Sequence, residues 1–359
     1  MFLAPVYLVI LLSSVLFIFY VERKMPAFIQ DRLGPMETGP YGILQAIADL
    51  LKMIQKEDIV PAKSDAFLFK AAPFVIMIAV FAGYMVVPLS EQLQPSYLES
   101  GVFFILSIVS LDVLGMFMAG WGSGNKYALI GAIRSVAQII SYEIPVGLSV
   151  LCVVIACGTL DLQDMCMQQK TGATSYLFGI PLEVFNMTNY GGFLSWNIVK
   201  YPTLVFVFVI FYIGTLAECN RAPFDLPEAE SELVAGFHSE YSGFRFAIFF
   251  LAEYGMMLLV SLMATIFFFG GWNSPLPNIG VLRLNSWTSG GDIPVLINLC
   301  GAFWILTKSM AIMVTHVWVR WTYPRLRIDQ LMGLCWKYLT PMALILVVLT
   351  ALLKGVQLG

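Results

Sequence analysis

The chain has 359 residues, of which 59% are hydrophobic and only 12% are charged, and its formal net charge is −3. A mean hydropathy of +0.81 lies far above that of water-soluble globular proteins, which excludes a soluble domain. We therefore expect an all-α, polytopic integral membrane protein.

Hydrophobic runs of membrane-spanning length recur along the whole chain. A helix needs roughly 20 apolar residues to cross the hydrocarbon layer. We predict a single membrane domain over residues 1–359, with eight spans near 2–22, 71–89, 99–121, 144–160, 201–219, 244–270, 293–319 and 340–356. The first run has no basic leader and no small-residue cleavage site, so it is predicted to remain as an anchor.

The basic residues predict the orientation of these spans, because Lys and Arg are retained on the cytoplasmic or matrix side. With the N-terminus outside, fifteen Lys and Arg residues fall in inner loops and four in outer loops. We therefore expect both termini on the outer side, periplasmic or intermembrane. The acidic loop at residues 218–243 then faces inward.

Three inner segments have sequence patterns that a simple connecting loop does not need. Residues 30–40 contain repeated Gly-Pro turn signals and predict a strap that shapes a cavity or binds a partner. Residues 42–56 and 126–142 each carry a polar stripe opposite an apolar one, which predicts two helices in the plane of the membrane surface. Asn125 is the expected N-cap of the second surface helix.

The acidic loop concentrates charge between two apolar spans. Six carboxylates lie between residues 217 and 245: Glu218, Asp225, Glu228, Glu230, Glu232 and Glu240. Pro227 suits the first turn of a short helix, whose positive end would favour the glutamates that follow it. Arg221 is the nearest cation. This loop is where we first look for function.

Several familiar site types are excluded by spacing. The Gly-rich stretch 120–126 lacks the pattern of a phosphate loop or a dinucleotide fingerprint. The six cysteines form no Cys-x-x-Cys pair, and the two histidines have no partner at ligand spacing. We expect no metal site and no bound redox cofactor in this chain. The longest outer loop, residues 161–200, is predicted to be a surface excursion.

Ionisable residues inside or beside the spans are functional candidates, because a charge at the bilayer centre costs about 2.5–3.5 kcal/mol even on the gentlest scale. The set comprises Asp112, Glu143, Glu218, Glu253 and Lys308. They are either paired struts between helices or parts of a proton or ion path. The inward clustering of the three glutamates favours a path, since closely spaced carboxylates titrate as a coupled group.

A long series of motifs closely resembles the quinone-site membrane subunits of respiratory complex I, the NADH:quinone oxidoreductase of bacteria and mitochondria. The resemblance rests on the loop from Glu218 to Gly243 followed by Ala252-Glu253-Tyr254. Further matches occur in the same order: Glu22-Arg23-Lys24, Gln30-x-Arg32, the surface helix from Gly39, Gly120-Trp121 and Arg134 to Glu143. Nearly the whole chain is covered. Met36 and Ala46 depart from the usual Asn and Pro of the family, at the chamber entrance.

The resemblance implies about eight tilted helices that form the membrane side of a quinone chamber. Quinone, either ubiquinone or menaquinone, is the implied substrate, entering from the bilayer near the first helix, the strap and the sixth helix. Arg32, Asp49, Arg221 and Asp225 are implied to line the chamber. The implied proton path and coupling residues are Glu143, Glu218, Glu253, Glu228, Glu230 and Glu232.

The same resemblance implies the partners and the membrane. Soluble-arm subunits, one of which carries the terminal iron-sulfur cluster, would close the chamber, and antiporter-like and small membrane subunits would lie beside the chain in lipid. No nucleic-acid partner is expected. The location would be the bacterial or mitochondrial inner membrane.

Three alternatives stay open at the level of sequence. A related membrane subunit of an energy-converting hydrogenase would couple electron transfer to ion pumping without quinone. A stand-alone cation/proton transporter would make Lys308 and Asp112 central, although the chain shows no evident inverted repeat. A purely structural anchor would leave the buried carboxylates unexplained.

Overall fold

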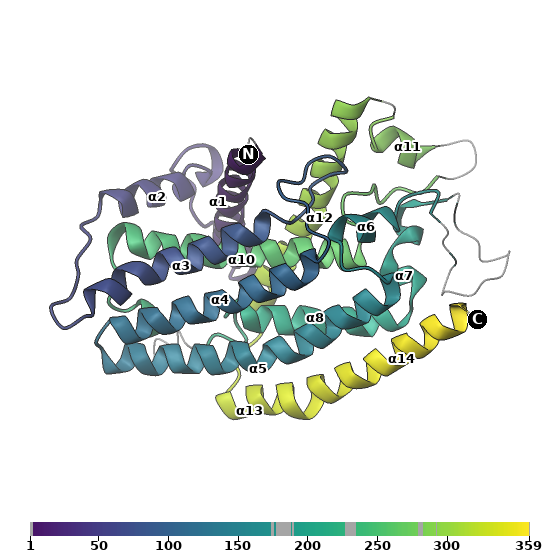
Figure 1. The fold of residues 1–359 in the computed structure, drawn as a ribbon. Coiled ribbons are helices and arrows are strands. Elements are labelled where there is room, and N and C mark those ends of the chain that lie inside the picture. The colour runs from purple at the N-terminus through teal and green to yellow at the C-terminus, as the bar shows by residue number, and fades with distance from the viewer. Residues whose placement is uncertain are drawn as a thin grey trace.

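A computed structural model describes residues 3–173, 176, 188, 190–226, 235–278, 283–291 and 293–358 (Figure 1). Across these residues the protein is helical and has no β-strand, which confirms the predicted all-α class. Seven described helical stretches are long and apolar enough to cross a membrane. The remaining predicted span corresponds to α8 (Thr203–Glu218), an apolar helix of only 16 residues. The chain is a multi-pass membrane protein.

The elements can be named in chain order. The long stretches are α1 (Leu3–Ile29), α3 (Ala66–Tyr84), α4 (Gly101–Gly122), α5 (Lys126–Cys157), α10 (Gly243–Phe268), α12 (Pro294–Thr322), and the continuous run of α13 (Ile328–Gly333), a π-helical segment (Leu334–Leu339) and α14 (Thr340–Leu358). Short helices connect them: η1 (Pro40–Gly42), α2 (Gln45–Gln55), α6 (Leu162–Met167), η4 (Gly192–Ser195), α7 (Asn197–Lys200), η5 (Gly236–His238) and α11 (Leu284–Thr288).

Helix α5 corrects the prediction of a surface helix over 126–142 that is separate from a span over 144–160. The two are one helix of 32 residues, which is roughly 48 Å long and exceeds the hydrocarbon thickness. The only breaker, Pro145, lies inside α5 and does not end it. The helix begins at the expected N-cap, because the Asn125 side chain accepts the N–H of Tyr127 at 3.0 Å, and it ends at Gly158 in the left-handed region.

Other helix ends differ from the predicted ones for local reasons. Helix α3 begins five residues earlier than expected, because the Asp65 carboxylate accepts the N–H groups of Phe67 and Leu68. Helix α1 continues to Ile29, beyond the charged residues at 22–24 where the predicted span ends. The last span is prolonged at its start by α13 and the π-helical segment. The extension of α1 places Arg23 in a helical position beside the cavities described below.

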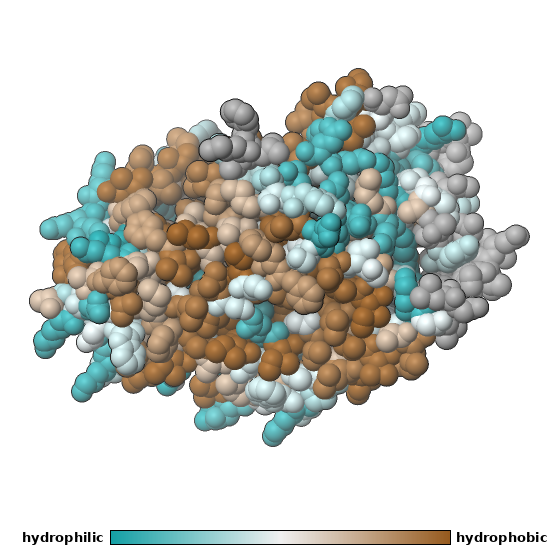
Figure 2. Space-filling view, viewed as in Figure 1, coloured by the Kyte–Doolittle hydropathy of each residue, from teal (hydrophilic) through white to brown (hydrophobic). Residues whose placement is uncertain are grey.

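Helix α10 runs through the centre of the molecule, with α3, α4 and α5 side by side on one flank and α14 along α5 (Figure 1). Almost every residue of α10 from Ile248 onward is buried, which is typical of a helix that is hydrophobic on all sides. Hydrophobic surface covers the flanks of the long helices, while polar residues gather toward the two ends (Figure 2). This distribution matches a protein whose flanks contact lipid.

The described part of the outer segment 161–200 is packed instead of forming the expected surface excursion. The buried Gln169 and Asn197 side chains donate to the carbonyls of Ile266 and Phe267, at the end of α10. The buried Lys200 ammonium donates to the Gln168 carbonyl, and burial lowers the pKa of Lys200 to about 8. Side-chain amides therefore satisfy backbone carbonyls that α10 cannot pair within itself.

Candidate functional site

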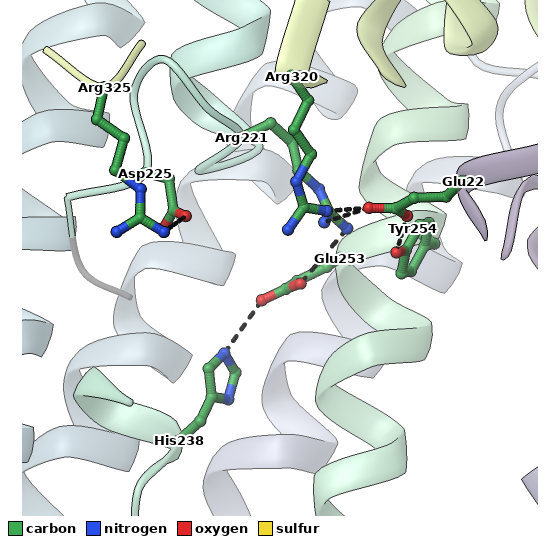
Figure 3. A network of polar contacts seen from close by, with 8 residues as sticks. All are labelled: Glu22, Arg221, Asp225, His238, Glu253, Tyr254, Arg320 and Arg325. Atoms are coloured by element: carbon green, nitrogen blue, oxygen red, sulfur yellow. Dashed lines mark hydrogen bonds and ion pairs between the residues drawn. The ribbon is translucent and has the colours of Figure 1, made fainter. Parts of the chain in front are cut away.

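A buried polar network lies where four segments of the chain meet (Figure 3). Glu22 comes from α1, Arg221 from the turn after α8, Tyr254 from α10 and Arg320 from the last turn of α12. The Arg320 guanidinium and the Tyr254 hydroxyl both donate to the Glu22 carboxylate. Arg221 Nη1 lies 3.8 Å from Glu22 Oε1. One carboxylate is therefore bound by two guanidinium groups and a phenol.

Arg221 links this carboxylate to a second one. Its side chain is only 6% exposed, and Nη2 lies 3.6 Å from Oε2 of Glu253. Its guanidinium carbon is 4.4 Å from the centre of the Tyr254 ring, close enough for a cation–π interaction. Arg221 thus compensates two carboxylates from two helices, which reduces the cost of burying all three charges.

The turn that carries Arg221 is held from α5. The Gln138 side-chain amide donates to the carbonyls of Ala217 and Phe224, both at 2.8 Å, so one side chain clasps both ends of the turn. Asn220 occupies the left-handed region with φ 48°, which Asn tolerates better than most residues. The Arg221 backbone is therefore held by contacts that are separate from the ion pairs of its side chain.

A short 3₁₀ turn places a histidine against Glu253. His238 Nε2 lies 3.1 Å from Glu253 Oε1, and the His238 side chain is buried. The turn passes very close to α5, where a Cβ on Gly131 would lie only 2.8 Å from the Cα of Gly236. Glycine at position 131 is therefore required for the backbone to reach this position.

A cavity of about 600 Å³ opens beside the network. Its polar lining includes Glu22, Arg23, Arg32 and Arg320, and its remaining residues are Phe19, Pro26, Gly34, Pro35, Phe250, Tyr254 and Trp321. The strap around Arg32 therefore forms part of the wall, as its turn-rich sequence predicts. Lys24 fixes the strap by donating to the carbonyls of Leu33 and Pro35 at 3.3 and 2.7 Å.

A second cavity of about 330 Å³ lies between α1, α2 and α10. Its lining is mostly apolar, and Asp49 and Lys52 come from the polar face of α2. Phe19, Arg23 and Phe250 line both cavities. Arg23 is also ion-paired with Asp49. The two cavities are therefore neighbours that share three side chains.

Two small cavities lead away from Glu253 through the helix bundle. The first, of about 20 Å³, is lined by Asp112, Glu218 and Glu253, and the second, of about 30 Å³, by Glu143 and Glu218. Each is large enough for about one water molecule. The Ser110 hydroxyl donates to Glu143 at the far end. Glu218 belongs to both cavities and connects them.

The family model described as NADH dehydrogenase matches residues 3–351. The chain belongs to this family. Its relatives are H subunits of NADH-quinone oxidoreductase. The one numbered 2 from Cytophaga hutchinsonii is 52% identical over 98% of each chain. The one from Chlorobaculum parvum is 50% identical over 93% of this chain and 86% of that one, and the one from Bacteroides fragilis is 42% identical over 93% and 85%.

These relatives confirm the resemblance to the membrane subunit of complex I, a part of an oxidoreductase complex. They do not favour a hydrogenase complex, a stand-alone transporter or a structural anchor. Quinone oxidoreductase is the name that all three relatives carry.

The structure brings some of the family's expected site residues together and not others. Glu143, Glu218 and Glu253 line consecutive cavities, and Arg32 lines the large one. Asp49 lines the second cavity, not the large one. Glu228, Glu230 and Glu232 lie outside the described residues.

Asp225 is placed differently from its expected position in the chamber wall. Its carboxylate is buried and lies 3.1 Å from Nη2 of Arg325, in the loop after α12. The backbone N–H of Leu326 in the same loop donates to the Pro223 carbonyl at 3.0 Å. Asp225 therefore ties two loops together.

Sequence reasoning misses several residues of the network. It treats Arg320 only as an orientation signal, although this residue also contacts Glu22. It considers His238 only as a metal ligand, and it does not consider Ser110. The sequence feature that could have indicated a role for Arg320 in the site is its position as a basic residue in the last turn of an apolar helix.

The contacts of Lys308 explain why a charged residue is present inside an apolar helix. Its ammonium donates to the carbonyls of Phe269 and Asn273, both at 2.8 Å, just beyond the C-terminus of α10. It also lies 5.4 Å from the centre of the Trp196 ring. A cation at this end of a helix is favourable because the helix dipole is negative there. Lys308 therefore makes a capping contact.

Proposed function

We propose that this chain forms the membrane side of the quinone chamber of a proton-translocating NADH-quinone oxidoreductase and carries protons away from that chamber through its carboxylates. The observation that carries the proposal is the succession of cavities. Glu22 lines the chamber of about 600 Å³, and Arg221 links Glu22 to Glu253. Two water-sized cavities then join Glu253 to Glu218 and Glu218 to Glu143.

The chamber fits a quinone because it combines aromatic walls with a few polar groups. Phe19 and Phe250 offer flat apolar surfaces, and Arg32 and Arg320 offer N–H donors that can bind carbonyl oxygens of a headgroup. The adjoining apolar cavity between α1, α2 and α10 suits the isoprenoid tail at the entrance from the bilayer. Either ubiquinone or menaquinone has this chemistry. No redox cofactor bound within the chain is part of the proposal.

The proposed partners are those of the family. Soluble-arm subunits, including the one with the terminal iron-sulfur cluster, would close the chamber and supply the electrons. Antiporter-like and small membrane subunits would receive the protons that leave Glu143. The inner membrane of a bacterium or mitochondrion is the proposed location, with both termini on its outer side as the basic residues predict.

The decisive variant is Glu218→Gln in membranes that contain the assembled complex. Gln has nearly the same shape but cannot carry a proton at neutral pH. Glu218 also forms none of the described ion pairs, so its replacement leaves no described cation without its partner. We expect normal assembly with a roughly tenfold or greater fall in both quinone reduction and proton pumping.

Glu91→Gln is the matched control, because Glu91 is paired with Lys170 at 2.9 Å and lines none of the four cavities described above. It should leave both activities unchanged. If Glu218→Gln pumps and reduces quinone as well as the Glu91→Gln complex does, the carboxylate succession is not the proton path.

A further inference from the structure

Asp112 is a buried acid that no role described so far uses. It lies in the middle of α4 and is only 9% exposed. Its Oδ1 atom is enclosed and has no hydrogen-bond partner among the residues that the structure describes. No Lys, Arg or His of the described chain forms an ion pair with it, in contrast to Glu22, Glu253 and Asp225.

The surroundings of Asp112 give no packing reason for an acid. Its neighbours in the small cavity include Ile76, Met116 and Met256, which are apolar. Burying a carboxyl group among such residues without a cation costs free energy. A carboxyl group in this position can reduce its charge only by binding a proton.

The cavity that Asp112 lines also contains Glu218 and Glu253, so α4, α8 and α10 each contribute one carboxyl group to a space of about 20 Å³. A buried water normally makes two to four hydrogen bonds. Three carboxyl groups and the Asn220 amide line this space and can supply these partners. A water molecule in this space would have all three acids among its neighbours.

We propose that Asp112 is a proton-carrying residue between Glu253 and Glu218. In the first step Glu253, after its carboxylate has taken up a proton from the chamber side, loses that proton as its O–H bond breaks. The water in the cavity accepts the proton and releases another, and an O–H bond forms on the Asp112 carboxylate. In the second step the Asp112 proton passes by the same water to the Glu218 carboxylate. Negative charge moves in the opposite direction, and no oxidant or reductant is needed.

This inference rests on the proposed function, since it adds a station to the same path. It distinguishes Asp112 from Lys308, the other unassigned internal charge, whose ammonium is satisfied by two carbonyls. An unpartnered acid at a junction of cavities is available for proton exchange, whereas a capped lysine is not.

The test compares Asp112→Asn, Asp112→Glu and Ser107→Ala in the assembled complex. Ser107 is an exposed residue of the same helix that donates to the Phe103 carbonyl, so it controls for substitution within α4. Asn should lower proton pumping and quinone reduction roughly tenfold or more, and Glu should restore most of both. Ser107→Ala should behave as wild type.

Infrared difference spectra recorded on quinone reduction provide a readout that a structural role would not move. The wild-type and Ser107→Ala complexes should show a C=O band of a protonated carboxyl group that shifts in heavy water. The band should be lost in Asp112→Asn. If Asn prevents assembly, Asp112→Ser replaces it, because serine can bind the water but carries no acidic proton.

The outcomes separate the two proposals. Wild-type rates and an unchanged band in Asp112→Asn, with Glu218→Gln impaired, would overturn the role of Asp112 and leave the proton path standing. Equal loss of activity in the Asn and Glu variants, with lowered thermal stability, would also overturn it in favour of a packing role. Wild-type behaviour of Glu218→Gln would remove the path itself.

Discussion

Gly131 is the position where one methyl group should disturb the site from a distance. A Cβ at Gly131 would lie 2.8 Å from the Cα of Gly236, whereas ordinary van der Waals contact begins near 3.4 Å. The turn must therefore retreat by about half an ångström or more. The same turn carries His238, whose Nε2 is 3.1 Å from Glu253, so we expect Gly131→Ala to distort this contact.

Gly147 of the same helix is the matched control, because a Cβ there would have no described neighbour within 4 Å. Both Gly→Ala changes gain about the same helix propensity, up to about 1 kcal/mol. The difference between them therefore isolates the overpacking cost, which is about 1–3 kcal/mol. Gly131→Ala should be less stable than Gly147→Ala by that amount.

The assay combines thermal inactivation of the purified complex, quinone reduction, and hydrogen exchange of the turn at residues 235–242. We expect faster inactivation, a several-fold lower rate and faster exchange in Gly131→Ala only. The reasoning is refuted if Gly131→Ala and Gly147→Ala are indistinguishable in all three measurements, because the turn would then not depend on the close approach.

Further predictions concern contacts away from the proton path. Lys308→Met should destabilise the complex by about 2 kcal/mol in thermal inactivation, because two charge-assisted hydrogen bonds are lost. The ratio of protons pumped to electrons transferred should stay unchanged, and a changed ratio would contradict the capping role. Arg325→Ala should lower the stability of the loop around Asp225 by only about 1 kcal/mol, because the arginine is half exposed. Hydrogen exchange in this loop should then be roughly fivefold faster. Burial lowers the pKa of Lys200 from 10.5 to about 8, so the unfolded chain binds this proton more tightly than the folded chain. The free energy of unfolding therefore decreases as the pH falls from 10.5 toward 8. Lys200→Met should therefore gain more stability over wild type at pH 7 than at pH 9, and a pH-independent difference would argue against burial of a charge.

The spans and the inward carboxylates could be predicted because the bilayer imposes simple rules. A segment in hydrocarbon must satisfy its backbone internally, so apolar length alone indicates a helix. Glu218 and Glu253 could be placed on the same side of the membrane from helix direction and the basic loops. The structure then brings both into one cavity.

The pairings could not be predicted, because they depend on how helices pack. Nothing in the sequence near Glu22 indicates that its partner is Arg320 of α12. The continuity of α5 is also hidden, since the polar stripe of residues 126–142 is typical of a surface helix and Pro145 suggests a boundary. Hydropathy reports the environment of a residue and contains no information on its partner.

The Glu22–Arg320 contact spans 298 residues of sequence, so it cannot form until residue 320 has been synthesised. At about 5–20 residues per second, the first helix waits on the order of 15–60 s before the ribosome supplies its arginine. Until then Glu22 lacks the guanidinium group that donates to it in the finished protein. A nascent chain that stops short of residue 320 can insert most of its helices and still have an unfinished site.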